Sequence, residues 1–431
     1  MNIPNSALLS LLSLVFLLLL PGPQALAAES QTPSLEAMWE IVQRQQAQIE
    51  SLSEELENTR TQLAGAEQKA RITEEQLDLT ASYLEQIEQK KDSGWAGRTQ
   101  VGGYGEMHYN NLNASDESQD LKEVDFHRFV AFINHQFTDR VRFFSEIEIE
   151  HSLVKDTADG SSSGEVEVEQ AYIEFDLNDN LAARGGLFLL PIGILNETHE
   201  PNTFYGVERN NVESIIIPST WWEGGGAIGG HYGNGLSWDF ALHSGLATPT
   251  SGSSAFRVRS GRQKVSNASA ENLAFTARLK YTGIPGLELA AAMNYQDDAS
   301  QVSGDGLDDG TLVSLHGIWN RGPFALRALW GQWNFNGDAV ELAGADKQTG
   351  WYIEPSLRLG RTTNDWGIYT RYEDLEGARG QDQFAQWEVG FNYWPVSNVV
   401  LKFDYRDREH DLDSDSGRDF TGFDLGIGYQ F

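Results

Sequence analysis

The sequence predicts an all-β fold: a 16-stranded antiparallel transmembrane β-barrel, preceded by an N-terminal α-helical coiled coil. Two observations lead to this expectation. Between residues 35 and 87, apolar side chains recur at alternating spacings of three and four, which is typical of a coiled coil. Beyond Gly97 the apolar period changes to two, in sixteen segments that are joined by alternating short and long connections.

The first 27 residues have the pattern of a signal peptide. Leu8 to Leu20 is an almost unbroken apolar run, too short to span a bilayer as a helix, and Ala25-Leu26-Ala27 follows as an A-x-A cleavage site. No Lys or Arg precedes the run, so a retained anchor is the alternative. Both alternatives send the protein out of the cytoplasm, and no later apolar run is long enough for a transmembrane helix.

Residues 28–96 are expected to form a periplasmic coiled coil and a linker. Polar residues interrupt the apolar seam at Gln45, Thr59, Thr73 and Thr80, where such residues fix register and strand number. The outer face is too polar to be buried, so we expect the helix to associate with copies of itself, as a trimer. A single helix that folds back on the barrel is the alternative.

Residues 97–431 are expected to form the barrel. The last segment shows the period of two, because apolar residues from Phe423 to Phe431 alternate with small or polar ones. An even number of strands places both ends of the barrel on the periplasmic side. Tryptophans near segment ends predict an interfacial girdle: Trp221, Trp222, Trp330, Trp333, Trp351, Trp387 and Trp394. We expect the following segments: 100–112, 122–137, 140–155, 164–178, 181–193, 223–233, 234–246, 270–283, 286–297, 310–321, 323–336, 349–361, 365–374, 381–395, 398–409 and 418–431.

Composition and motifs argue against several classes of function. The net charge of -32 argues against nucleic acid as a partner, because a phosphate backbone needs a basic surface. The G-x-S-x-G pattern at 160–164 joins two strand-like segments rather than a strand and a helix, so it does not indicate a hydrolase. The nine histidines show no ligand spacing. We therefore expect no enzyme, no cofactor and no metal site.

The long connection 194–222 is the main candidate for a functional element. A loop of this length in a compact barrel can fold inward and narrow the lumen, and an external flap is the alternative. Its charged residues Glu200, Glu208, Arg209 and Glu213 are candidate constriction residues. Further basic candidates come from the inward strand faces, where they are accompanied by carboxylates: Arg142, Arg184, Arg278, Lys280, Arg327, Arg358, Lys402 and Arg406.

The run Leu189-Leu190-Pro191-Ile192-Gly193, followed by Phe204, Glu208 and Arg209, resembles the constriction-loop region of the phosphate-selective porin O and P family. In that family a P-x-G is followed by an aromatic residue and then by E-R. The chain departs from the family in having no dense basic run that matches its arginine ladder or its lysine cluster. Only Arg209 carries over by motif.

The resemblance implies a trimeric 16-stranded porin of the bacterial outer membrane, through which small hydrophilic solutes diffuse passively, with a preference for anions such as phosphate. The expected partners are other copies of the chain, outer-membrane lipid and lipopolysaccharide, and the barrel-assembly machinery, since the end at Phe431 looks like its recognition signal. The alternative function is a plugged structural or adhesive barrel that tethers the envelope through its coiled coil.

Overall fold

The computed structural model describes residues 94–153, 164–360 and 364–431, together with Trp39, Gln43 and Gln46. The chain divides into two compact units, Met1–Leu79 and Thr80–Phe431. The expected signal peptide lies outside the described residues. So does the expected coiled coil, apart from Trp39, Gln43 and Gln46, which are helical and exposed.

The second unit contains a closed antiparallel barrel of sixteen strands, which confirms the predicted fold class. Each strand pairs with its neighbours in sequence, and β1 closes the barrel against β16. The strands are β1 (Thr99–Ala114), β2 (Leu121–Thr138), β3 (Val141–Glu150), β4 (Val166–Asn178), β5 (Leu181–Leu189), β6 (Trp222–His231), β7 (Leu236–Ser244), β8 (Leu273–Ile284), β9 (Leu287–Gln296), β10 (Gly310–Arg321), β11 (Phe324–Phe335), β12 (Lys347–Leu359), β13 (Asp365–Glu376), β14 (Gln383–Val396), β15 (Val399–His410) and β16 (Phe420–Gln430).

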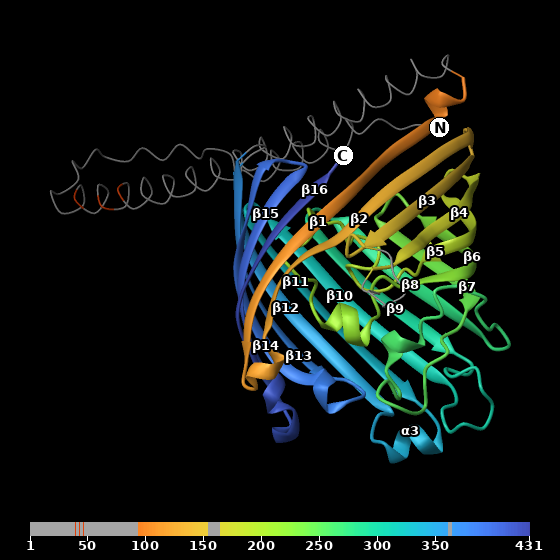
Figure 1. Ribbon diagram of the computed structural model, residues 1–431. Coiled ribbons are helices and arrows are strands. Elements are labelled where there is room, and N and C mark those ends of the chain that lie inside the picture. Colours follow the sequence, from red (N-terminus) through yellow and green to blue (C-terminus); the bar gives the residue numbers. More distant parts are fainter. Residues whose placement is uncertain (1–38, 40–42, 44–45, 47–93, 154–163, 361–363) are drawn as a thin grey trace, which may run out of the picture. The chain divides into compact units, whose positions relative to one another are not determined.

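Both ends of the barrel sequence lie at the same rim (Figure 1). Tyr104 near the start of β1 pairs with Gln430 at the end of β16, and Gly103 and Phe431 exchange two backbone hydrogen bonds. Short turns join the strands at this rim, as between β2 and β3, whereas the longer loops lie at the opposite rim. This arrangement is the one that the alternation of short and long connections predicts.

One short helix precedes β1, and others occupy several of the connections between strands. They are η1 (Ala96–Arg98), η2 (Glu117–Gln119), η3 (Val212–Ile216), η4 (Val258–Gly261), α3 (Asp338–Leu342), η5 (Gly380–Asp382) and η6 (Asp413–Arg418). Within the described part of the chain, none of the helices has the length and apolar character needed to cross a membrane.

Successive side chains of each strand point to opposite faces of the barrel wall. In β14, Trp387 and Val389 are each 56% exposed on the outside, whereas the intervening Glu388 is 3% exposed and faces the interior. The same alternation makes the outer face apolar along most strands, with Phe240 and Leu242 in β7 as another example. The interior face can be charged because sixteen strands enclose a wide lumen instead of a solid core.

The structure corrects part of the predicted tryptophan girdle. Trp351 and Trp387 are exposed on the outer face, as expected for a girdle. Trp221 and Trp333 are fully buried and pack against each other inside the lumen, with ring centroids 6.2 Å apart. Trp222 and Trp394, which were also expected in the girdle, are buried as well. The physical reason is that the lumen contains a folded loop, which gives interior tryptophans an apolar partner.

Candidate functional site

The connection between β5 and β6, residues 190–221, folds into the barrel and is called the inner loop below (Figure 1, yellow-green). It reaches the inner faces of strands on the far side of the wall. Arg327 of β11 donates to the Thr203 carbonyl at 2.8 Å, and Lys402 of β15 donates to the Gly206 carbonyl at 2.8 Å. The basic side chains of the wall therefore hold the loop through its backbone oxygens.

The near side of the wall binds the inner loop through ionisable side chains. Nε2 of His199 lies 3.3 Å from Glu146 in β3 and 3.5 Å from Glu169 in β4, and all three side chains are buried. Burial alone would lower the pKa of the His199 imidazole, but hydrogen bonds and charge from Glu146 and Glu169 raise it well above its usual value. Through these contacts His199 joins the inner loop to β3 and β4.

Apolar residues of the inner loop form a core inside the lumen. Ile216 and Ile217 are fully buried in one cluster with Trp333 of β11 and Tyr352 of β12. Trp333 also donates from Nε1 to the Ile216 carbonyl at 2.9 Å. At about 25 cal/mol per Å² of buried apolar surface, such a cluster favours the inward position over an exposed flap.

Glycines on the inner wall leave room for the loop. A Cβ at Gly350 of β12 would stand 2.8 Å from Ile216, and a Cβ at Gly428 of β16 would stand 2.4 Å from Pro201. Both separations are shorter than a carbon–carbon contact allows. The absence of a side chain at these positions is what lets the loop backbone lie against the wall.

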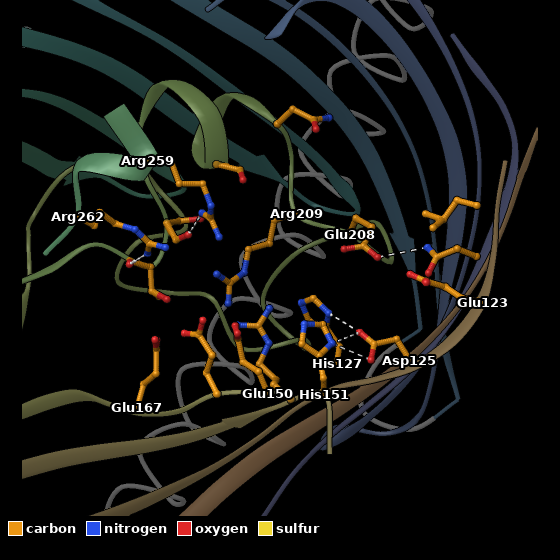
Figure 2. A pocket seen from close by; sticks show the side chains of 18 of the residues that line it. Glu123, Asp125, His127, Glu150, His151, Glu167, Glu208, Arg209, Arg259 and Arg262 are labelled. Carbon is orange, nitrogen blue, oxygen red and sulfur yellow. Dashed lines mark hydrogen bonds and ion pairs between the residues drawn. The ribbon is translucent and has the colours of Figure 1, made fainter. Parts of the chain in front are cut away.

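Beside the inner loop lies a cavity of about 550 Å³, called the charged cavity below (Figure 2). Its floor and walls come from β1 to β4, β15, the inner loop and the connection between β7 and β8. Six basic side chains line it: Arg128, Arg209, Arg259, Arg262, Lys264 and Arg406. Six carboxylates also line it: Glu123, Asp125, Glu150, Glu165, Glu167 and Glu208.

The charges are partly segregated within the charged cavity, although Arg128 and Arg406 lie on strands and Glu208 lies on the inner loop. Figure 2 shows Arg259, Arg262 and Arg209 on the side of the loops, facing Glu167, Glu150 and Asp125 along the strands. Arg259 and Arg262 donate to the carbonyls of Ser219 and Thr220 in the inner loop. Two opposed walls of unlike charge produce a field across the space between them.

Arg209 has unsatisfied hydrogen-bonding capacity. Its Nε and Nη2 are buried, and neither meets a hydrogen-bond partner within the described ranges. Buried donors of a guanidinium are normally paired, so an unpaired one at the edge of a cavity favours binding of an anion or a polar solute there.

Of the residues selected from the sequence, Glu208, Arg209 and Arg406 line the charged cavity. Glu200 lies on the inner loop, but its side chain does not line this cavity. Glu213 is fully buried within the loop, where it accepts hydrogen bonds from the backbone N–H groups of Ile194 and Leu195.

The remaining basic candidates lie elsewhere on the inner face. Arg278, Lys280 and Arg327 line a second cavity of about 480 Å³, which includes the short turn between β8 and β9. Arg142 pairs with Glu174 and Asp176 of β4, and Arg184 lies over the Phe188 ring. Arg358 stacks on Trp394 with 4.0 Å between its guanidinium carbon and the ring centroid, and Lys402 lies 3.7 Å from the Phe204 centroid.

Sequence reasoning missed Arg259, Arg262 and Lys264. They belong to the long connection between β7 and β8, which has no strand period and no motif. Lys264 pairs with Glu165 and Glu167 in the lining of the charged cavity. The one available signal was the density of four basic residues between Arg257 and Lys264, which is high for an acidic chain.

Comparison with known proteins gives one sequence relative and several structural ones. An uncharacterized protein of Aquifex aeolicus (strain VF5) is 31% identical over 336 residues, which cover 71% of this chain and 74% of the relative. The chain belongs to the family of that Aquifex protein. No family model matches the chain, so the resemblance to phosphate-selective porins stays a prediction for this family.

Solved structures with a similar fold are outer-membrane porins. The anion-selective porin from Comamonas acidovorans aligns with a TM-score of 0.53 and 14% identity, covering 77% of this chain and 99% of the porin. OmpF of Salmonella typhi, solved in complex with daunomycin, aligns with a TM-score of 0.53 and 13% identity, covering 77% and 97%. At these identities the likeness shows that the chain shares their barrel fold, and the fold alone.

Proposed function

We propose that the protein is an outer-membrane porin, through which small hydrophilic solutes diffuse passively. The observation that carries this proposal is the inner loop, which folds into a wide barrel and leaves a cavity lined by twelve charged side chains. Such a cavity is suited to hydrated, polar solutes and not to a lipid or an apolar ligand. The apolar outer face supports a position in a bilayer, because lipid-facing residues of such barrels are apolar.

A weak preference for anions fits the arginines of the charged cavity. Burial, followed by the neighbouring charges of Arg262 and Arg257, lowers the pKa of Arg259 to about 9. Neighbouring positive charge that lowers the pKa of Arg259 in this way is not fully compensated by carboxylates. An anion that passes through the cavity would therefore stabilise the charged arginines. Six carboxylates share the space, which argues against strict selection of phosphate.

The assembly completes the proposal. We infer a homotrimer in the bacterial outer membrane, inserted by the barrel-assembly machinery and surrounded by lipid and lipopolysaccharide. In this arrangement the predicted coiled coil lies in the periplasm.

The test is the reversal potential of the purified protein in a planar bilayer under a salt gradient, with and without phosphate. We expect an open channel with weak anion preference. Arg209→Gln should lower the anion-to-cation permeability ratio by roughly twofold or more, and Glu150→Gln should raise it, because each removes charge from one wall of the cavity. Lys122→Gln is the matched control, since Lys122 is exposed, pairs with Asp120 and lies outside the cavity.

Two outcomes would contradict parts of this proposal. Equal permeability ratios for Arg209→Gln, Glu150→Gln and Lys122→Gln would show that the charged cavity does not lie on the path of the ions. No conductance at all would favour the plugged structural barrel, in which the apolar core of the inner loop closes the lumen.

A further inference from the structure

Two histidines and one aspartate converge on the strand side of the charged cavity. Nδ1 of His127 lies 3.2 Å from Oδ2 of Asp125, and Nδ1 of His151 lies 2.9 Å from the same carboxylate (Figure 2). One ligand atom from each of the three residues lies within 4.8 Å of the other two. Ligands held about 2.0–2.1 Å from a tetrahedral ion are roughly 3.3 Å apart, so two of these separations are already close to that geometry.

The backbone brings these side chains together from β2 and from the residue that follows β3. Asp125 and His127 are two positions apart in β2, so their side chains point to the same face of the strand. The pairing of β1 with β2 shifts register between Glu106 and His108, opposite residues 125–128. A bulge of this kind re-aims side chains, and here both His127 and Arg128 reach the interior.

His151 follows the end of β3 in a strained conformation. Its φ is 54°, in the left-handed region that a residue other than glycine seldom adopts. The same backbone places it beside β2, because its N–H donates to the His127 carbonyl at 3.2 Å. Strain of this kind is retained where the surrounding structure fixes it, commonly at functional sites.

The cluster is sheltered but remains accessible from the cavity. The side chains of Asp125, His127 and His151 are 19%, 27% and 35% exposed. Glu123 and Glu150 line the cavity on the same side, and Arg128 is neutralised by Glu106 at 2.6 Å and Glu148 at 3.5 Å. The local field therefore favours a cation at this wall, although the cavity as a whole is balanced.

We propose that Asp125, His127 and His151 bind a divalent transition-metal ion of the Zn²⁺ class. Two imidazoles with one carboxylate suit Zn²⁺, whereas Mg²⁺ and Ca²⁺ prefer oxygen ligands throughout. Three protein ligands leave a position open toward the cavity, where water or a solute anion completes the coordination. The bound ion places positive charge on the acidic wall.

The experiment measures Zn²⁺ binding to purified protein that carries no histidine tag and has been stripped with EDTA. Isothermal titration in detergent should give one Zn²⁺ per chain, with no comparable binding of Mg²⁺. His151→Gln and His127→Gln should each weaken Zn²⁺ binding by at least about tenfold. His316→Gln is the matched control, because His316 pairs with a single carboxylate, Glu288, outside the cluster.

Heat-dependent migration on gels shows that each variant still forms a barrel. Zn²⁺ binding that is equal in His127→Gln, His151→Gln and His316→Gln would overturn the proposal, as would equal binding of Mg²⁺ and Zn²⁺ to the unaltered protein.

A second readout rests on the proposed porin function. In planar bilayers, micromolar Zn²⁺ should shift the reversal potential toward anions in the unaltered protein, reversibly on addition of EDTA, and should fail to do so in His151→Gln. If the protein binds one Zn²⁺ through the cluster but does not conduct, the metal-site proposal stands and the porin proposal is wrong. A conducting protein that binds no Zn²⁺ would retain the porin and lose the site.

Discussion

The carboxylate of Glu213 accepts hydrogen bonds from Ile194, Leu195, Asn210 and Tyr352. Its position on a long connection made it a candidate for the constriction, and sequence alone gives no means of telling a lumen-facing carboxylate from a buried one. These contacts show that Glu213 stabilises the inner loop, because its carboxylate joins the start of the loop to its middle and to β12.

Replacing Glu213 with Gln should loosen the inner loop. The amide keeps the shape of the side chain, but it offers one uncharged acceptor oxygen in place of the two carboxylate oxygens. The backbone donors therefore lose charge-assisted hydrogen bonds, which should destabilise the loop by on the order of 2 kcal/mol. We expect noisier single-channel currents and faster cleavage of the loop by added protease. Glu200→Gln, on the same loop without such contacts, should behave as the unaltered protein, and equal noise in the two variants would contradict this role.

The histidine cluster shows where residue-level reading of the sequence stops. Metal-ligand spacing is recognisable when ligands share a helix or a short loop, but Asp125, His127 and His151 come from a bulged strand and from the residue after its neighbour. Their proximity depends on the register of β2 against β3, which pairs Arg128 with Glu150. The sequence contains the residues, and only the pairing brings them together.

At the scale of elements, the length of the connection between β5 and β6 predicted a loop that folds inward, with an external flap as the alternative. The sequence could not show which positions of the barrel wall the loop packs against. Gly350 and Gly428 stand on different strands, and each is small because a segment distant in sequence passes over it. The abundance of glycine was evident from composition, but its reason requires the packing of the loop on the wall.

Gly350→Leu should displace the inner loop. The new side chain would occupy the space of Ile216 and Val212, so the short helix η3 must move away from β12. We expect a change in single-channel conductance of roughly 30% or more, in a barrel that still folds, since overpacking costs about 1–3 kcal/mol. Gly226→Leu is the control, because a Cβ at Gly226 would meet no atom closer than 3.8 Å. An equal change of conductance in this variant would contradict the role of Gly350 in making room for the inner loop.

At the scale of the whole molecule, sequence predicted the barrel well. All sixteen expected segments coincide with strands to within a few residues, because an apolar exterior and a polar lumen impose a period of two on every strand. The connection between β7 and β8 follows no such rule, so its arginines could not be placed. Trp333 was misplaced for a related reason, since a lumen filled by a loop has an apolar interior that strand rhythm does not reveal.

The predicted coiled coil should act on assembly and leave the barrel unchanged. The barrel closes on itself through β1 and β16, so its fold does not depend on the preceding segment. The predicted seam between residues 35 and 87, roughly eight heptads long, would contribute free energy of association between chains. Deleting residues 28–92 should therefore lower the temperature at which oligomers dissociate on gels, while the heat-dependent shift of the barrel monomer and the conductance of each channel persist.

Substitutions in the predicted seam distinguish loss of the contact between helices from loss of the whole segment. Leu56→Asp with Leu63→Asp puts charge in the predicted seam and should reproduce the deletion, whereas Asn58→Asp adds charge to the outer face and should not. Oligomers equally heat-resistant in all three proteins would mean that the barrels associate through their own walls. In that case the polar seam residues Thr59 and Thr73 would not be setting the number of chains, and the helix would act alone in the periplasm.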